Sequence, residues 1–358
     1  MASADEIRDV VLQVEGSVCS TIFSTGPGAG DRHTVVATGA EALFAAAALA
    51  HEGKRASAVL RPAELLGAIE ALHAVARGRA PITIHVLGSG ADQLRPGRDE
   101  LAPAFDAGAG VIVTWSAQDS IDVALAARRA AEDSETPFVI VSDGGGPVMS
   151  LPGAGLVSKF LGDTVEKRGP AVPHHHVDSK RRERSFAARV PFALAAAMRE
   201  LGDLTARPLA PVERYETTDA EEVLVAVGHT FVAARAVAAA LRSEGRRVGA
   251  VGVRALRPFF AAEVVKAMAR ARSVVVLEPL DIALAPAGPL ATSLKAAFAD
   301  ALTWAPGFPG VGRIPTIVSV VFATLEGAVS EAQVREALAE LGAGDRAKRL
   351  LVFGGGGP

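Results

Sequence analysis

Cysteine and aromatic residues are scarce in this sequence. Cys19 is the one cysteine, which excludes an intrachain disulfide and an iron–sulfur cluster held by cysteines of this chain alone. Aromatic residues make up 5% of the chain, so its cores are expected to consist of alanine, valine and leucine. That composition suits helices layered on parallel sheets. Electron-carrying clusters, if the function needs them, are expected on other polypeptides.

An excess of charge and long apolar runs are also missing. The formal net charge is −3, and the basic residues are scattered apart from Lys180–Arg184 (KRRER), so no pattern for nucleic acid is present. The N-terminus has no basic region followed by an apolar stretch, and no apolar run reaches about 18 residues. We therefore expect a cytoplasmic protein with neither nucleic acid nor a membrane as its partner.

The length and the local patterns predict two α/β domains. With 358 residues and 49% hydrophobic content, the chain is long enough for two buried cores. Strand and helix patterns alternate from about residue 34 onward, so residues 1–150 are predicted to form a domain with a mostly parallel sheet and right-handed crossovers. The pattern loosens over the proline-containing residues 151–218, which we interpret as a connecting segment. Residues 219–345 predict a second, smaller α/β domain, and residues 346–358 form a glycine-rich tail.

Individual elements follow from apolar runs and capping signals. Strands are predicted at Ala56–Leu60, Pro81–Leu87, Gly110–Trp115, Pro137–Ser142, Glu222–Val227, Arg247–Val253 and Ser273–Leu277. Helices are predicted at Gly39–His51, Ala63–Arg77, 117–132, Thr230–Ser243, Ala261–Arg270, Thr292–Leu302 and Glu331–Leu341. Capping boxes are expected for Ser116 with Asp119 and for Ser330 with Gln333, and Gly245 is expected to end a helix.

Three strings in the second half of the chain point to a family. They are Ala220–Gly228 (AEEVLVAVG), Leu241–Gly249 (LRSEGRRVG) and Val253–Phe259 (VRALRPF). In order and spacing they resemble the second domain of pyruvate:ferredoxin oxidoreductase. Two upstream segments, Glu200–Arg207 and 116–144, are similar to further parts of the same family. The resemblance covers roughly residues 34 to 342, and it is to the alpha-type part of the 2-oxoacid:ferredoxin oxidoreductases.

The resemblance implies a fold, a cofactor and partners. The first domain would be the pyrimidine-binding half of a thiamine diphosphate fold, and the second would be of the transketolase C-terminal type. The sequence contains no Gly-Asp-Gly, the motif that supplies oxygen ligands for Mg²⁺ on the diphosphate side. A diphosphate-binding, beta-type subunit would therefore share thiamine diphosphate with this chain in a hetero-oligomer. Cluster-bearing subunits would pass electrons to ferredoxin, and the isolated chain would be inactive in oxidising a pyruvate-like 2-oxoacid.

The chain departs from the family at its catalytic motifs. The family glutamate that activates the cofactor falls near Thr38 or Gly39, so Glu41 is the candidate cofactor-binding residue. The alternative is a solvated glutamate in the first turn of a helix. The family's substrate-facing string is not reproduced at Phe23–Gly30, a second family string is replaced by Leu60–Leu65 (LRPAEL), and the family arginine is replaced by Ser89. The resemblance therefore assigns no catalytic residue, and an inactive scaffold subunit that binds no cofactor is the alternative function.

Other motifs have ordinary structural interpretations beside functional ones. Gly26–Gly30 is expected to be a flexible loop rather than a phosphate loop, because no Lys-Ser or Lys-Thr follows it. The run His174–His176 is expected to be solvated rather than metal-binding. A plain side-chain cap is expected at Gly228–Thr230 rather than an anion site, and Cys19 has no identifiable base. A small-molecule binder that uses the crevice between the domains is a third possible function.

Overall fold

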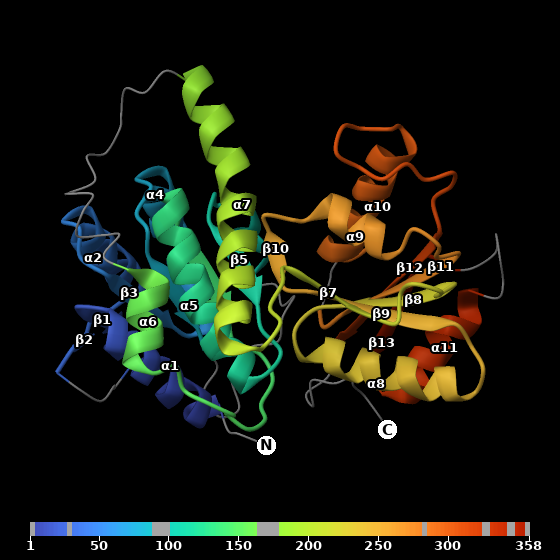
Figure 1. Ribbon diagram of the computed structural model, residues 1–358, viewed down its shortest axis with the longest axis horizontal. Coiled ribbons are helices and arrows are strands. Elements are labelled where there is room, and N and C mark those ends of the chain that lie inside the picture. The colour runs from blue at the N-terminus through green and yellow to red at the C-terminus, as the bar shows by residue number, and fades with distance from the viewer. Residues whose placement is uncertain are drawn as a thin grey trace. The chain divides into compact units, whose positions relative to one another are not determined.

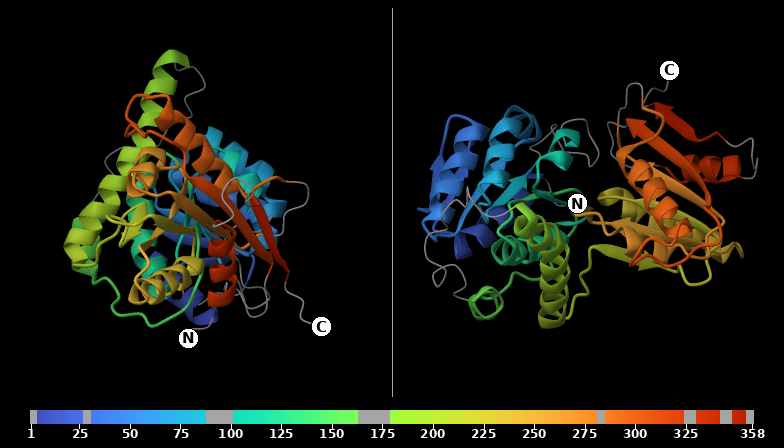
Figure 2. Two further views of the ribbon diagram at one scale, coloured as in Figure 1. Left: turned by 90° about the vertical axis from the view of Figure 1, so that its right-hand side faces the viewer. Right: turned by 90° about the horizontal axis from the view of Figure 1, so that it is seen from above.

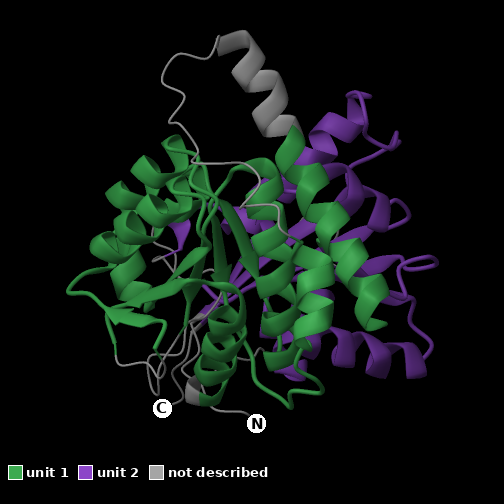
Figure 3. Cartoon of the chain, turned by 60° about the vertical axis from the view of Figure 1, so that its left-hand side comes forward, with its two compact units in different colours: residues 1–94, 103–211 green, residues 95–102, 212–358 purple. Residues whose placement is uncertain are grey.

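The computed structural model describes residues 4–26, 31–87, 101–162, 179–280, 285–323, 330–341 and 348–354 (Figure 1). They form two compact units, which Figure 3 colours separately. Most of the first unit precedes Pro211, and most of the second follows Val212. No helix among the described residues is both long enough and apolar enough to cross a bilayer.

The first unit is built on a parallel sheet. Its strands are β1 (Thr21–Ser24), β2 (His33–Val35), β3 (Ala56–Leu60), β4 (Thr83–Val86), β5 (Gly110–Val113) and β6 (Phe138–Val141). They lie in the order β5-β6-β4-β3-β1-β2, and every neighbouring pair in this order is parallel. Strands β3 to β6 are buried along their whole length, which explains their continuous apolar sequences. The parallel sheet predicted for this half of the chain is confirmed.

Helices cover this sheet. They are α1 (Ala4–Val18), α2 (Gly39–His51), α3 (Pro62–Gly67), α4 (Ile69–Arg77), α5 (Ala117–Ser134), α6 (Ala154–Leu161) and α7 (Ser179–Thr205), with a 3-10 turn, η1 (Ala102–Asp106). Helix α5 is almost entirely buried, and it packs against α1, α6 and α7. The hydroxyl of Ser116 caps α5 by accepting from the Asp119 N–H at 3.1 Å, as predicted. The Asp119 carboxylate reaches back one residue further than expected and accepts from the Trp115 N–H.

Two predicted features of this unit take a different form. One helix was expected over Ala63–Arg77, but the chain forms two, α3 and α4, which are separated at Ala68. The predicted connecting segment, residues 151–218, contains α6 and α7, and both pack against α5. Part of that segment is therefore helical structure of the first unit. The division of the chain into residues 1–150, 151–218 and 219–345 stays a prediction.

The outward face of α2 is unusually apolar. Between Glu41 and Glu52 the helix has no acidic or basic residue except His51. Its inner face packs on β1, β3 and α4. On the outer face the side chain of Phe44 is 51% exposed, and Ala48 is also exposed. A helix that is apolar all round is typically buried on all sides, so this face is expected to be covered in the working protein.

The second unit has a mixed sheet. Its strands are β7 (Val212–Tyr215), β8 (Glu222–Ala226), β9 (Val248–Val253), β11 (Ser273–Glu278), β12 (Thr316–Ala323) and β13 (Leu350–Gly354). The short strand β10 (Ala255–Arg257) follows β9 in the chain but is not part of this sheet. The order is β13-β12-β11-β8-β9-β7, and only β7 of these runs antiparallel to its neighbour. The sheet is therefore mostly parallel, as the second predicted α/β domain requires.

Helices lie on both faces of this second sheet, as two further views make clear (Figure 2). They are α8 (His229–Ser243), α9 (Ala261–Ala267), α10 (Pro289–Leu302) and α11 (Glu331–Leu341). Helices α8 and α11 share one face, and α9 and α10 share the other. Gly245 has a φ of +88° just after α8, and Ser330 and Gln333 form the predicted capping box at α11. These end signals are confirmed.

Candidate functional site

The carboxyl ends of β1, β3 and β4 meet at one edge of the first sheet. A cleft opens there, and it is lined by Arg8, Thr25, Gly26, Val59, Leu60, Arg61, Glu64 and Leu87. The segments belong together because parallel strands that are neighbours in the sheet end on the same side. In open α/β sheets ligands bind outside the carboxyl ends of the strands, so this cleft is the candidate functional site.

Arg61 and Glu64 form the polar wall of the cleft. The Arg61 guanidinium donates from Nε and Nη2 to Glu64 Oε1, at 2.8 and 2.6 Å. The Arg61 backbone N–H donates to Glu64 Oε2 at 2.7 Å, which closes the first turn of α3. Burial alone would raise the pKa of Glu64, but these contacts and the Thr25 hydroxyl lower it below its usual value. Glu64 is therefore charged, and it holds an arginine whose side chain remains 59% exposed.

Arg8 reaches the same cleft from α1. A Cβ atom placed on Gly26 would lie 3.1 Å from Arg8 Nη2, so the guanidinium end of Arg8 lies against the turn that follows β1. Glycine at position 26 leaves the room that this arginine occupies. The cleft is thus lined by two guanidinium groups and one carboxylate, a net charge of +1.

A buried polar cluster fixes α1 on the sheet. Glu15 lies seven residues beyond Arg8, which is two helical turns along the same face of α1. Its Oε2 accepts from Arg128 Nη2 at 2.6 Å, and its Oε1 lies 2.8 Å from His85 Nε2. Arg128 also donates to the Thr83 hydroxyl and, at 3.0 Å, to the carbonyl of Ala56. The cluster ties α1 to α5, β3 and β4 through side chains that water does not reach.

The charges in this cluster compensate one another. Burial would raise the pKa of Glu15, but the neighbouring Arg128 and His85 hold it well below its usual range. Cys19, the one cysteine, donates to Glu15 Oε2 from its thiol at 3.0 Å, and burial raises the pKa of that thiol. A buried thiol with a raised pKa is a poor nucleophile, in agreement with the absence of a base for it in the sequence.

Sequence reasoning missed α1 and the cluster that it carries. The signal was present, because Ile7, Val11 and Val14 recur at helical spacing and all three are buried. What the sequence could not supply was the pairing of Glu15 with Arg128, which lies 113 residues away. Only the fold brings these two side chains together.

Glu41, the predicted cofactor-binding residue, lies in the first turn of α2 beside the cleft. Its Oε2 accepts from the Ala37 N–H at 2.9 Å, and its own N–H donates to the Thr38 hydroxyl at 3.2 Å. Thr38 therefore caps an exposed helix end, and the Glu41 carboxylate reaches back to the residue before the cap. Gly39 lets α2 approach α3, because a Cβ there would lie 2.8 Å from the Glu64 carbonyl oxygen. The side chain is exposed to a ligand at this edge, and its role toward a cofactor stays a prediction.

Other predicted motifs do not join this site. Helix α8 begins at His229 with Gly228 as its N-cap, and no side chain caps it, so the expected cap by His229 or Thr230 is wrong. His174–His176 and Ser89 lie outside the described residues. Of the predicted loop Gly26–Gly30, only Gly26 is described. Within the described ranges, no group of three or more His, Cys, Asp or Glu side chains could hold a metal ion.

A second buried carboxylate lies in the other unit. Glu278 ends β11, and its Oε1 and Oε2 accept from the Leu290 and Ala291 N–H groups at 2.7 and 3.2 Å. These donors belong to the first turn of α10. Burial raises the pKa of Glu278 to about 7, although the two N–H groups and Lys295 act in the opposite direction. The carboxylate thus titrates near neutral pH.

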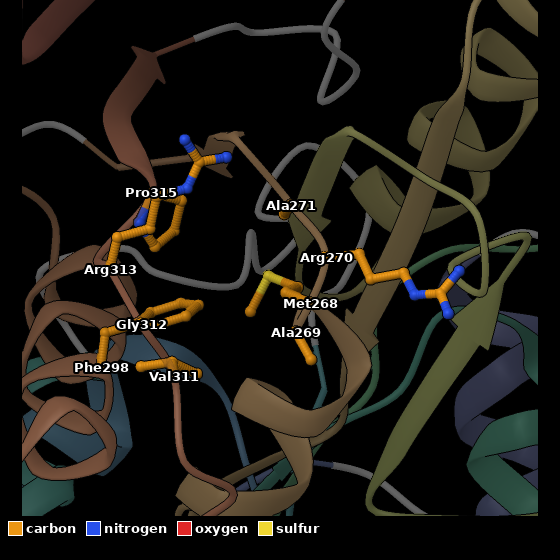
Figure 4. A pocket seen from close by; sticks show the side chains of 9 residues that line it. All are labelled: Met268, Ala269, Arg270, Ala271, Phe298, Val311, Gly312, Arg313 and Pro315. Atoms are coloured by element: carbon orange, nitrogen blue, oxygen red, sulfur yellow. The ribbon is translucent and has the colours of Figure 1, made fainter.

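A larger cleft in the second unit is a weaker candidate. It has a volume of about 390 Å³, and Met268, Phe298, Val311, Arg270 and Arg313 are among its lining residues. Arg270 extends away from the other labelled side chains instead of converging with Arg313 (Figure 4). The lining segments precede β11 and β12, so the cleft lies at the amino ends of these strands. Ligands in open α/β sheets bind at the carboxyl ends of the strands, and the Arg270 and Arg313 side chains do not converge on a common point. Both observations disfavour this cleft as an active site.

Comparison with known proteins supports the family resemblance. Residues 220–310 match the model of pyruvate:ferredoxin oxidoreductase core domain II. Pyruvate synthase subunit PorA of Methanothermobacter thermautotrophicus is 28% identical over 214 residues, which are 54% of this chain and 55% of that protein. These matches support the resemblance of the chain to the alpha-type part of the 2-oxoacid:ferredoxin oxidoreductases. PorA of Thermotoga maritima is 27% identical over 233 residues, which are 58% of this chain and 59% of that protein.

Two solved structures share the fold of this chain. The 2-oxoglutarate:ferredoxin oxidoreductase of Magnetococcus marinus, which holds 2-oxoglutarate, coenzyme A and succinyl-CoA, aligns with 95% of this chain and 64% of its own. The TM-score is 0.63 at 13% identity. A split-gene transketolase, an inactive beta4 tetramer, aligns over 88% of this chain and 89% of its own, with a TM-score of 0.52 and 15% identity. The predicted α/β fold with mostly parallel sheets is confirmed. The chain spans less than two thirds of the curated relatives it matches.

Proposed function

We propose that this chain is the alpha-type subunit of a 2-oxoacid:ferredoxin oxidoreductase complex that acts on a pyruvate-like acid. It would contribute the pyrimidine side of a thiamine diphosphate site, at the carboxyl edge of β1, β3 and β4. When bound, the cofactor would supply the carbanion chemistry that releases carbon dioxide from the acid. This chain would orient the acid and exclude water. A beta-type subunit would hold the diphosphate with Mg²⁺, and cluster-bearing subunits would carry the electrons to ferredoxin.

The match of residues 220–310 to core domain II carries this proposal. It lies in the half of the chain whose motifs are specific in order and spacing, and the curated relatives are subunits of pyruvate synthases. The cleft of the first unit adds support, because its position agrees with the edge at which open α/β sheets bind ligands. The apolar outer face of α2 beside this edge also fits a chain that works against a partner.

Purification of the tagged chain from its native source tests the subunit assignment. We expect it to return a second polypeptide with a Gly-Asp-Gly motif and a third that is rich in cysteine. The complex should reduce ferredoxin or a viologen dye with pyruvate and coenzyme A, whereas the isolated chain should not. Recovery of this chain alone, under conditions that keep a known multisubunit oxidoreductase intact, would contradict the assignment.

An inactive scaffold is the second candidate, and the substituted motifs at Glu41 and Leu60–Leu65 favour it. Such a subunit would retain the fold and the contacts of the family but bind no cofactor. Titration calorimetry of the purified complex with thiamine diphosphate and Mg²⁺ separates the two candidates. Cofactor binding together with turnover of a 2-oxoacid excludes the scaffold, and a complex that assembles without either supports it.

Glu41→Gln separates the two roles of that side chain. The glutamine amide oxygen can also accept from the Ala37 N–H, so the unfolding free energy should change by less than about 1 kcal/mol. If Glu41 activates the cofactor, turnover by the purified complex should fall by about 100-fold or more, because glutamine cannot take a proton. Glu52→Gln, at the other end of α2, should leave turnover unchanged. Wild-type turnover in the Glu41→Gln complex would reduce Glu41 to a helix cap.

A further inference from the structure

The 390 Å³ cleft of the second unit combines an apolar floor with unpaired positive charge. Met268, Phe298 and Val311 form the floor, and all three side chains are buried in the core of the unit. The described lining holds two cations, Arg270 and Arg313, and no acidic residue, so its charge is +2. A surface of this kind attracts negative charge, although the whole chain has a formal net charge of −3.

Both arginines are available to a partner. Each lies on the surface, and within the described part of the chain neither forms an ion pair or a side-chain hydrogen bond. Lys266 and Arg272 lie close to them in the sequence and add positive charge, which Asp300 offsets in part. Most other arginines of this unit, such as Arg246 and Arg335, already bind a carboxylate of the same chain.

A tryptophan exposed to solvent lies at the border of this cleft. Trp304 follows α10, its side chain is 76% exposed, and its φ of +59° is uncommon for a bulky residue. Gly310 lets the indole ring lie against the backbone, because a Cβ atom there would overlap the ring. Val311, the next residue, lines the cleft. Tryptophan and arginine are the residue types that most often dominate the binding energy of protein interfaces.

The directions of the two arginines favour an extended partner over a small anion. Guanidinium groups that converge can hold one carboxylate or phosphate between them. Here Arg270 extends away from Arg313 and from the other labelled side chains, so a small anion would meet only one of them (Figure 4). A polypeptide segment can instead place an apolar side chain over the floor and an acidic side chain on each arginine.

We propose that this face of the second unit docks an acidic segment of a partner polypeptide. An apolar residue of the segment covers Met268 and Val311, acidic residues bind Arg270 and Arg313, and the segment contacts Trp304. The inference goes beyond the proposed function and does not depend on it, because neither a cofactor nor a 2-oxoacid takes part. The face lies at the amino ends of β11 and β12, so a docked segment leaves the carboxyl ends of these strands uncovered.

Trp304 can report the binding of such a segment to the full-length chain. After Trp115→Phe it is the only tryptophan, and its emission should move to shorter wavelength when a segment covers the ring. The probe is the peptide Glu-Asp-Phe-Asp-Glu, and the matched neutral peptide has the corresponding amides. The acidic peptide should shift the emission saturably, the neutral peptide should bind about 10-fold more weakly or less, and added salt should weaken the acidic peptide. Anisotropy of a fluorescein-labelled acidic peptide repeats the measurement on the unsubstituted chain.

Substitution of the arginines locates the binding site. Arg270→Gln and Arg313→Gln should each weaken binding of the acidic peptide by about 5-fold or more, because each removes a charge-assisted contact. Arg235→Gln is the matched control and should leave binding unchanged. It removes the same charge from the exposed side of α8, on the opposite face of the same sheet. Circular dichroism of each variant establishes that the chain is folded.

Three results would overturn the proposal. The first is the absence of any emission or anisotropy change with the acidic peptide, or equal binding by the wild type and both arginine variants. The second is tighter binding of a mixed-sequence oligodeoxynucleotide than of the peptide, which would assign the face to nucleic acid. The third is self-association in sedimentation experiments that Arg270→Gln and Arg313→Gln abolish, which would make a second copy of this chain the occupant.

Discussion

Glu15→Ala is expected to destabilise the first unit by about 3–5 kcal/mol. The substitution would leave Arg128 buried with its charge uncompensated, and breaking a buried ion pair from one side costs about that much. The Arg128 side chain is fully inaccessible to water, so it has no route to solvation in the folded state. Urea denaturation followed by Trp115 fluorescence would measure the change. Trp115 is buried in the first unit, and the only other tryptophan, Trp304, can be replaced by phenylalanine in the reporter background.

A surface pair in the same unit provides the control. Asp133→Ala removes the partner of Arg129, whose Nε donates to it at 2.8 Å one helical turn away. These side chains are 32% and 24% exposed, so the loss should be about 0.5 kcal/mol or less. Equal midpoint shifts for Glu15→Ala and Asp133→Ala would show that the buried cluster contributes no more than a surface pair.

The stability of the second unit should fall as the pH rises from about 5 to 8. The unfolded chain releases the Glu278 proton near pH 4.5, whereas the folded chain keeps it until about pH 7. Between these values the folded state binds more protons, so the unfolding free energy decreases with pH and then levels off. The gap between the two pKa values corresponds to roughly 3 kcal/mol. Urea denaturation by circular dichroism at several pH values would measure this, with Trp115 fluorescence identifying the transition of the first unit.

Glu278→Gln should remove most of this pH dependence. The amide oxygen can still accept from the first turn of α10, but the side chain no longer acquires charge on deprotonation. The variant should match the wild type near pH 5 and exceed it by up to about 3 kcal/mol at pH 8. Glu263→Gln, on the exposed side of α9, should keep the wild-type profile. Parallel profiles for the wild type and Glu278→Gln would show that this carboxylate does not govern the effect.

Much of the architecture was predictable from local patterns. Buried parallel strands such as β6 have uninterrupted apolar sequences, and helices such as α8 end at glycines with the expected conformation. The interior strands β1 and β12 were not predicted, and neither were the edge strands β2 and β13. Strand β2 has three residues and none of them is buried, so its sequence carries no periodic signal. Strand β13 lies inside residues 346–358, which were predicted to be a glycine-rich tail, because the glycines there favoured a loop.

The candidate site was only partly predictable. Glu41 and Leu60–Leu65 were identified because the family resemblance aligned them with functional motifs, and they lie at one edge of the sheet. Arg8 was not identified, since it belongs to a helix that lies outside the resemblance. Its position depends on contacts between α1 and strands more than 60 residues away, such as the pair formed by Glu15 and His85. Contacts between residues so far apart in the sequence are set by the topology of the fold, so a local sequence pattern does not predict them.

The charge-free outer face of α2 has a consequence for how this sequence can drift. If another chain covers that face, a lysine at Ala48 would be tolerated by the isolated fold yet rejected in the assembled protein. Natural variation along α2 would then keep to small or apolar residues at Phe44 and Ala48, although neither position supports the core of its own domain. Restricted substitution at these two exposed positions would therefore indicate a contact with a partner that the isolated chain does not show.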